Sequence, residues 1–448
     1  MLVYYFFMAD SLKRSEDYII DEAPDIKTSS ENTFFLLRHI YRFLPALQNK
    51  NYQIYFAAGL VSLVGTWLQV VAEAALIVYT LRLPNTDLWV GIDGAAATLP
   101  TLFLSLFGGV IVDRLQKKKI LIFTQSASMV LALLYGVLTV THLVNIYEII
   151  ALAFGLGIVT ALDTPARQAF ISQLVDKEQL ASAVALNSGV FNAARVIGPT
   201  LAGILTGVIG AGGAFILNGL SYMPVIVGLF YMSVVEVLPK EHPSPFTAIK
   251  EGVQYAFGHP IIRVLLLMTG ITSIFGWSYT TMLPVLASDT FHMGPTGLGY
   301  LYAASGLGAL IAAFGVSALS SKGLTSWFIL GGNALFALAL VAFTFVRFLP
   351  LVYLLLFFAG IGLLAQFSTL NTTLQHLVTD EVRGRVMSLY ALVFIGFLPF
   401  GNLEVGFLSE TIGVENAIRI GAIIVFLFGA LIFFNRKRIQ ENYKTYQR

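Results

Sequence analysis

Gly108-Gly-Val-Ile-Val-Asp-Arg-Leu-Gln-Lys-Lys-Lys119 is the stretch that joins two long apolar segments of this chain. Asp113 and Arg114 end the first apolar segment, and three lysines follow before the second begins. Charged side chains are costly inside a bilayer, so a cluster of this kind belongs at a membrane surface. The stretch therefore predicts two membrane-spanning helices joined by a short charged turn.

The composition extends this interpretation to the whole chain. Of the 448 residues, 57% are hydrophobic and 12% are charged, whereas a soluble domain has about 25% charged residues. The mean hydropathy is +0.79. The sequence has no cysteine, and it lacks His-Glu-x-x-His and Walker-type patterns. We therefore expect an all-α integral membrane protein with no metal site and no cofactor, and we exclude a self-contained ATP-driven pump.

Twelve apolar segments are long enough to cross a bilayer, which takes about 20 residues each. They cover residues 53–80, 89–112, 119–140, 146–163, 181–207, 213–235, 260–288, 297–319, 325–346, 350–371, 384–409 and 415–435. Part of the preceding tail mixes Phe, Leu and Ile with Arg and His. We expect that part to form a helix lying on the membrane surface.

Lys and Arg are divided unevenly between the two sides of the predicted membrane. The side with both tails and the loop around Lys117 carries most of the 27 basic residues, whereas the opposite loops hold only Arg82 and Arg347. Arg195 and Arg419 lie within spans. Because positively charged loops stay in the cytoplasm, we expect both termini to be cytoplasmic and the chain to lie in the cell (inner or plasma) membrane.

An internal repeat divides the spans into two groups of six. At an offset of 203 residues, Gly157, Leu174, Val175, Leu186, Gly198, Gly203 and Gly210 match Gly360, Leu377, Val378, Leu389, Gly401, Gly406 and Gly413. Repeats of this kind are typical of transporters that use alternating access. The predicted parts are a cytoplasmic tail (1–51), a six-helix bundle (52–236), a cytoplasmic central loop (237–258), a second six-helix bundle (259–435) and a cytoplasmic C-terminal tail (436–448).

The opening stretch also has a recognisable pattern. Gly109, Asp113, Arg114, Lys117 and Lys118 follow the spacing Gly-x-x-x-Asp-Arg-x-x-Lys-Lys. This pattern resembles the signature of the loop between spans 2 and 3 in the major facilitator superfamily, and it occurs at the position where that family has it. The resemblance implies the major facilitator fold, with twelve transmembrane helices in two pseudo-symmetric six-helix bundles, and a gating role for these residues.

Further segments resemble one branch of that family. Ser62–Gln69, Asp163–Phe170, Asn192–Gly203 and Arg383–Met387 are similar to the drug–proton antiporter branch that includes macrolide exporters and the enterobactin exporter. Within the third segment, Gly198, Pro199 and Gly203 resemble the helix 5 motif of exporting members. The branch implies proton-coupled export of an amphipathic small molecule, drug-like or a siderophore, by alternating access, and it implies no enzymatic activity.

A gate is expected where span 2 meets span 11. Asp113 can face the start of span 11, where a helix N-terminus favours a carboxylate by about 0.3–1 kcal/mol. Arg383 or Arg385 can add a charge-assisted hydrogen bond. Asp163 and Arg167, at the cytoplasmic end of span 4, are further gating candidates. The alternatives are that Asp113 and the lysines only set the topology and that Asp163 and Arg167 form a solvated pair.

Coupling and substrate binding are expected to involve polar side chains inside the spans. Acids within spans are functional by default, so Glu73 is a proton-coupling candidate, and it departs from the family pattern, where a neutral residue is expected. Arg195 is the second such candidate and needs an anionic partner. Both also have a purely structural interpretation. The substrate-cavity candidates are Ser62, Thr66, Gln69, Asn192, Thr272, Tyr279, Gln366 and Asn371. We expect Asp93, Glu404 and Arg419 to be interfacial or interhelical instead.

Two other functions remain open on the sequence alone. An uptake symporter or facilitator would share the same fold. A receptor or scaffold without transport would be favoured by a soluble sensing or docking domain, and only the 51-residue tail is available for that role. The expected partners are a small-molecule substrate, protons and the lipid bilayer, with no nucleic acid, and the chain is expected to be a monomer.

Overall fold

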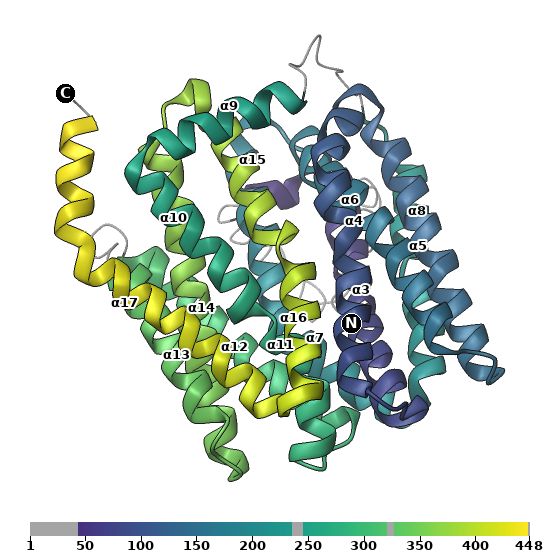
Figure 1. Ribbon diagram of the computed structural model, residues 1–448. Coiled ribbons are helices and arrows are strands. Elements are labelled where there is room, and N and C mark those ends of the chain that lie inside the picture. The colour runs from purple at the N-terminus through teal and green to yellow at the C-terminus, as the bar shows by residue number, and fades with distance from the viewer. Residues whose placement is uncertain (1–43, 235–244, 320–326, 447–448) are drawn as a thin grey trace, which may run out of the picture.

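The computed structural model of the chain describes residues 44–234, 245–319 and 327–446, and these residues form helices joined by short turns (Figure 1). Within these ranges only the backbone is described at residues 105–111, 113, 114, 192, 195, 245–251, 319, 380, 381 and 437–446. The predicted all-α fold is confirmed. The predicted surface helix in the tail lies mostly outside the described residues.

The first half of the chain forms one group of packed helices. A short turn, η1 (Pro45–Gln48), leads into α3 (Lys50–Ala75), which continues as the π-helical turn η2 (Leu76–Leu81). The other helices of this group are α4 (Thr86–Arg114), α5 (Lys117–Val140), α6 (Ile146–Leu174), α7 (Lys177–Ser221) and α8 (Met223–Tyr231). In this half α3 packs against α7, α4 against α6, and α5 against both α6 and α7.

The second half begins with α9 (Pro245–Gly258) and forms the other group. It continues with α10 (Pro260–Ile271), η3 (Thr272–Trp277), α11 (Tyr279–Val285), η4 (Leu286–Thr290), α12 (Pro295–Leu319), η6 (Trp327–Gly331), α13 (Gly332–Phe343), α14 (Leu349–Leu377), α15 (Asp380–Gly396), α16 (Leu398–Ile412) and α17 (Val414–Tyr446). Here η3, η4 and η6 are π-helical turns. Span 11 consists of α15 and α16 because the helix is interrupted at Phe397, directly before Leu398 and Pro399.

The long helix α7 contains two membrane passes rather than one. Gly210 has a φ of 73°, which interrupts the helix. Gly198, before this point, packs against Trp67 of α3, whereas Asn218, after it, binds the neighbouring Gln69. Both residues lie at the same level of α3, so the chain doubles back at Gly210.

The described helices follow the predicted order of twelve spans. Nine of them are long and apolar enough to cross a membrane, and one of these, Val196–Tyr231, contains the reversal at Gly210. The 29-residue α4 and the shorter apolar helix Trp327–Phe343 supply the two other passes. Large apolar side chains remain exposed on the outer faces of the helices, such as Val208 at 78% and Phe314 at 68%. In a chain of this hydropathy, such side chains face lipid.

Part of the predicted central loop is a helix. Residues 237–258 were expected to form a loop because they contain several prolines and charges, but α9 occupies Pro245–Gly258. Val253, Tyr255 and Ala256 of α9 pack on the apolar cluster of the second half. This buried apolar face supports the helix, whose sequence has only two charged residues, Lys250 and Glu251. The α9 helix marks one end of the molecule, the α9 end, which lies at the top of Figure 1.

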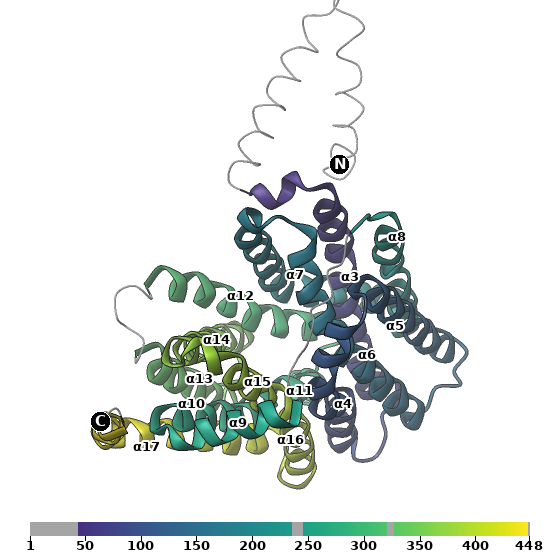
Figure 2. The same cartoon turned by 90° about the horizontal axis from the view of Figure 1, so that it is seen from above.

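The two halves approach each other most closely toward the opposite, distal end. A Cβ atom on Gly91 of α4 would lie 2.8 Å from the Cα atom of Gly406 in α16. A second contact joins α7 and α12, where a Cβ atom on Gly203 would lie 3.0 Å from the Cα atom of Gly299. Because Gly203 and Gly406 are equivalent in the repeat, the halves meet through two similar backbone contacts. Figure 2 shows the two groups of helices side by side from the α9 end.

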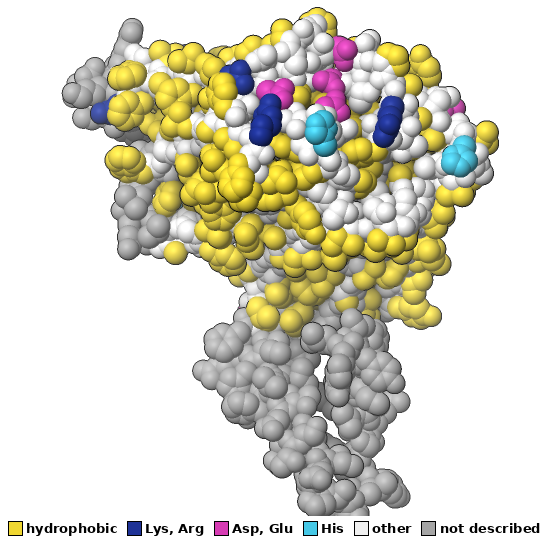
Figure 3. Space-filling view, turned by 90° about the horizontal axis from the view of Figure 1, so that it is seen from below, with side chains coloured by type: hydrophobic (Ala, Val, Ile, Leu, Met, Phe, Trp, Pro, Cys, Tyr) yellow, Lys and Arg dark blue, Asp and Glu magenta, His cyan; other side chains and the backbone are white. Residues whose placement is uncertain are grey.

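The distal contacts also include polar groups. The Ser409 hydroxyl of α16 donates a hydrogen bond to the Asp87 carboxylate of α4, and Thr296 donates to the Gly203 carbonyl oxygen at 3.3 Å. Within the second half, Glu415 accepts hydrogen bonds from Arg347 and Thr290 at 2.9 and 2.8 Å. Figure 3 views this end, where charged side chains gather over a limited area among apolar ones.

Candidate transport site

A cavity of about 400 Å³ lies between the two halves. Its walls come from α3 and α4 of the first half, and from η3, α11, α12, α14 and α16 of the second half. The contact between Gly91 and Gly406 lies level with the lining residue Val90, at the distal edge of the cavity. The cavity is therefore closed at the distal end by the contact between the halves.

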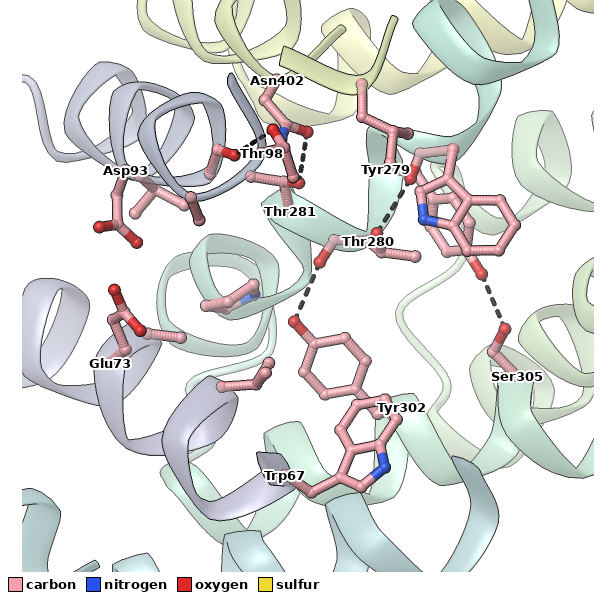
Figure 4. Close-up of a pocket in the computed structure, with 18 of the residues that line it drawn as sticks. Trp67, Glu73, Asp93, Thr98, Tyr279, Thr280, Thr281, Tyr302, Ser305 and Asn402 are labelled. Atoms are coloured by element: carbon pink, nitrogen blue, oxygen red, sulfur yellow. Dashed lines mark hydrogen bonds between the residues drawn. The ribbon is translucent and has the colours of Figure 1, made fainter. Parts of the chain in front are cut away.

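Two carboxyl groups face each other in this cavity. Glu73 of α3 and Asp93 of α4 point toward the same space, as Figure 4 shows, and they are close enough to interact directly. The Tyr135 hydroxyl donates to Glu73 Oε1 at 2.7 Å, and the Gln69 amide donates to Glu73 Oε2 at 3.3 Å. Asp93 Oδ1 is buried with no hydrogen-bond partner among the described residues.

Tyr135 connects Glu73 to the helix behind it. Its hydroxyl oxygen lies 2.7 Å from Glu73 Oε1 and 2.8 Å from the Ile149 carbonyl oxygen of α6. A hydroxyl carries one proton, so it cannot donate fully to both acceptors at once. The Tyr135 ring stacks on Phe215 of α7, with centroids 4.8 Å apart. This stacking fixes the position from which the hydroxyl reaches Glu73.

Aromatic and hydroxyl groups form the rest of the polar lining. The Trp67 and Tyr302 rings lie 6.2 Å apart across the junction of α3 and α12, and the Tyr302 hydroxyl donates to the Thr280 carbonyl oxygen at 3.0 Å. Tyr279 and Ser305 share a hydrogen bond of 2.7 Å. These bonds, shown in Figure 4, hold the rings in place. Among the described lining residues there is no Lys or Arg.

The candidate residues of span 1 have different surroundings. Glu73 lines the cavity, but Gln69 is buried and accepts a hydrogen bond from Asn218 at 3.0 Å. Ser62 is also buried, and the Thr66 hydroxyl donates to the Ser62 carbonyl oxygen at 3.0 Å. Ser62, Thr66 and Gln69 do not line the described cavity.

The predicted cavity residues of the second half are also divided. Tyr279 lines the cavity. Gln366 and Thr272 are buried behind it, where the Gln366 amide donates to the Thr272 hydroxyl at 2.9 Å and accepts from Asn333 at 3.4 Å. Asn371 accepts a hydrogen bond from Gln375 at 2.6 Å and is not part of the lining.

The helix 5 motif lies at close contacts with neighbouring helices. A Cβ atom on Gly198 would lie 2.2 Å from Cδ1 of Trp67, so this glycine makes room for a ring of the cavity wall. The Pro199 carbonyl oxygen would lie 2.5 Å from a Cβ atom on Gly299. With Gly203, these residues place α7 directly on α3 and α12.

Asp163 and Arg167 lie inside the first half. Asp163 pairs with Arg167 and accepts hydrogen bonds from Thr124 and Gln125 of α5 at 2.6 and 2.8 Å. Arg167 also contacts Tyr55 of α3. The pair therefore joins α3, α5 and α6 of one bundle.

The remaining gating candidates have different positions. Lys117 is buried at the start of α5, and the Lys118 ammonium donates to the Met232 carbonyl oxygen at 2.7 Å. Arg383 donates to the Gln375 carbonyl oxygen at 3.2 Å, and the Arg385 backbone packs against Gly252 of α9. Only the helical backbone of α4 and α7 is described at the other candidates, which are Gly109, Asp113, Arg114, Asn192 and Arg195.

Asp93 was expected to be interfacial or interhelical. It does meet a residue of another helix, Glu73 of α3, and the two line the cavity together. Its position seven residues into α4 fits either interpretation. The available signal was that an acid within an apolar helix is functional by default. Tyr135, Trp67 and Tyr302 carried no such signal because aromatic residues are abundant throughout the chain.

Twelve membrane passes in two groups, with a cavity between the groups, define a multi-pass membrane transporter. The chain belongs to the major facilitator superfamily, because the model of its family MFS_3, described as "Transmembrane secretion effector", matches residues 42–446. Members of this superfamily are transporters, so the chain is not an enzyme.

Individual relatives agree with this assignment. The staphyloferrin A transporter of Staphylococcus aureus is 28% identical over 389 residues, which cover 86% of this chain and 96% of the relative. The multidrug efflux pump Tap of Mycolicibacterium fortuitum is 24% identical, with 84% and 93% covered. The enterobactin exporter EntS of Salmonella choleraesuis is 25% identical over 47% of this chain and 51% of its own length.

Solved structures share the fold. A bacterial homologue of the lysosomal transporter Spinster, in an inward-facing and unoccupied conformation, superposes with a TM-score of 0.68 at 14% identity, covering 89% of this chain and 97% of that one. The nucleoside transporter NupG superposes with a TM-score of 0.67 at 12% identity, covering 86% and 98%. The predicted major facilitator fold is confirmed.

Proposed function

We propose that the chain exports an amphipathic small molecule by alternating access and that proton movement through Glu73 and Asp93 drives the export. The observation that carries this proposal is the pair of carboxyl groups facing each other in the cavity between the halves. Acids within spans mark proton relays in pumps and transporters. A pair of them in the cavity can take up a proton on one side and release it on the other.

The direction of transport rests on the relatives. Tap is named an efflux pump and EntS an exporter, and the Gly198-Pro199 segment resembles the helix 5 motif of exporters. Substrates named for the relatives include staphyloferrin A and enterobactin. We propose export for this chain, but we do not propose either of these particular substrates.

The proposed orientation places the α9 end in the cytoplasm, with both termini on that side. The basic residues of the loops support it through the positive-inside rule. The two six-helix bundles, 52–236 and 259–435, are the proposed moving units. With the halves in contact at the distal end, the cavity is closed at that end, which in this orientation faces away from the cytoplasm.

Asp113 is the proposed gate residue, acting with Arg383 or Arg385 when the α9 end closes. A contact made in only one of two states shifts the equilibrium between them. We expect Asp113→Asn to reduce export at least tenfold while the amount of protein in the membrane stays normal. Vesicle transport and immunoblotting of the same membranes measure the two quantities. Wild-type export by a correctly inserted variant would reject the gate.

Export is tested with inverted membrane vesicles whose lumen is acidified. The panel contains staphyloferrin A, enterobactin, a macrolide and tetraphenylphosphonium, and accumulation of each is measured. We expect proton-dependent accumulation of at least one compound, and a loss of at least tenfold in Glu73→Gln and in Asp93→Asn. Glu404→Gln is the matched control, because Glu404 lies within α16 but not in the cavity lining. Uptake into right-side-out vesicles instead would indicate a symporter.

A further inference from the structure

The described residues that line the cavity include acidic side chains and no basic ones. Glu73 and Asp93 contribute two carboxyl groups, while no Lys or Arg of the described residues lines the same space. Charges interact more strongly in a protein interior than in water. A cationic group entering this cavity would meet the carboxyl oxygens of Glu73 and Asp93 as acceptors.

The hydrogen bonds at the two acids leave one acceptor unused. Both oxygens of Glu73 accept from protein donors, Tyr135 and Gln69. Asp93 Oδ1, in contrast, is buried without a partner among the described residues. Buried polar atoms are normally hydrogen-bonded, so an unpaired acceptor facing a cavity is open to a donor from water or a ligand. A substrate ammonium group that enters the cavity would supply the missing donor.

The wall beside the acids is suited to the body of such a substrate. Trp67 lies six residues before Glu73 on α3, which is about 9 Å along the helix axis. Its ring and that of Tyr302 form one aromatic surface, and Trp277 and Tyr279 also line the cavity. Aromatic faces attract cations within about 6 Å and bury apolar groups. Figure 4 shows the acids and the Trp67–Tyr302 pair around the same space.

We infer that the substrate is an organic cation, whose ammonium or other cationic group binds between Glu73 and Asp93 while its apolar body packs on Trp67 and Tyr302. A cavity of about 400 Å³ is within the range of sites that hold drug-sized ligands. The inference deepens the proposed function and depends on it for transport, but not for binding.

Binding is tested with tetraphenylphosphonium and tetraphenylborate, which are matched in size and shape and opposite in charge. Each is titrated separately into the purified full-length chain in lipid nanodiscs, with empty nanodiscs subtracted, and tryptophan fluorescence is recorded. Two of the four tryptophans, Trp67 and Trp277, line the cavity. We expect saturable quenching by the cation and none by the anion.

Variants then place the cation at the acids. We expect Glu73→Gln and Asp93→Asn each to weaken tetraphenylphosphonium binding at least tenfold and Glu404→Gln to leave it unchanged. Equal binding of both ions by the wild-type chain overturns the inference, and that comparison needs no variant. Unchanged affinity in both acid variants overturns it as well. If the cation binds but does not accumulate in vesicles, the proposed export is rejected and the cation-binding site stands. If an uncharged compound is exported with protons and no cation binds, export stands and the cation-binding site is rejected.

Discussion

At the scale of single residues, the contacts of Asp163 and Arg167 distinguish a structural role of this ion pair from a gating role. The side chains are 14% and 28% exposed, and every hydrogen bond described for Asp163 comes from α5 or α6 of its own bundle. Removing one partner of a buried ion pair leaves the other charge uncompensated, which costs more than the pair itself contributes. The contacts favour a role in holding the first bundle together.

We therefore expect Arg167→Ala to destabilise the folded chain by about 2 kcal/mol, since Asp163 would keep only neutral donors. Thermal unfolding of the purified protein measures the effect. Arg436→Ala is the control, because the Arg436 side chain is exposed and donates to a carbonyl oxygen of its own helix. A stable Arg167→Ala protein that has lost transport would support the gating interpretation instead.

At the scale of the helices, the distal contact depends on glycines that allow backbones to touch. A Cβ atom on Gly203 would lie 2.6 Å from the Pro295 carbonyl oxygen of α12, which is too close for any side chain. Small residues at such interfaces let membrane helices approach each other closely. Enlarging Gly203 must push α7 away from α12, and hence one half away from the other.

We expect Gly203→Ala to disfavour the state seen here by about 1–3 kcal/mol, the usual cost of overpacking, and to open the distal end. Spin labels would be attached at Leu143→Cys and Gly294→Cys, which lie on different halves. Double electron–electron resonance should then report a longer distance between the two labels. Gly189→Ala on the same helix has open space around it and should leave the distance unchanged. Equal distances in all variants would show that the contact does not control the opening.

These helices also show what the sequence can and cannot predict. The twelve spans, the repeat and the gate pattern follow from hydropathy and spacing, which are local properties. The neighbours of a helix are not local. Periodicity places Gln69 and Glu73 on one face of α3, but only packing shows that Gln69 meets Asn218 while Glu73 meets the cavity. The Asp93 partner of Glu73 comes from another helix for the same reason.

Gly203 and helix α9 are two further cases in which the sequence did not predict the tertiary contact. Gly203 was predicted as part of a motif, yet its physical role is the contact with Pro295 and Gly299, which spacing within one helix cannot express. Helix α9 was predicted as a loop because prolines and charges precede it. Its burial against the second half, at residues such as Ala256, depends on tertiary structure and overrides the local sequence preference.

At the scale of the whole molecule, the distribution of Lys and Arg predicts which end faces the cytoplasm. The chain has no cysteine, so single cysteines can be introduced without first removing others. Gly258 ends α9, and Gly294 lies in the turn before α12 at the distal end. A Cβ atom added at either glycine would have open space within 4 Å, so each position accepts a small side chain.

In intact cells we expect a membrane-impermeant maleimide to label Gly294→Cys and not Gly258→Cys, and the reverse in inverted vesicles. Positively charged loops resist translocation, and this determines the orientation of every span together. Gel-shift labelling measures the result, with permeabilised cells, in which both sites should react, as the control. Labelling of Gly258→Cys in intact cells would invert the topology, and with it the side of the membrane toward which the distal contact closes the cavity.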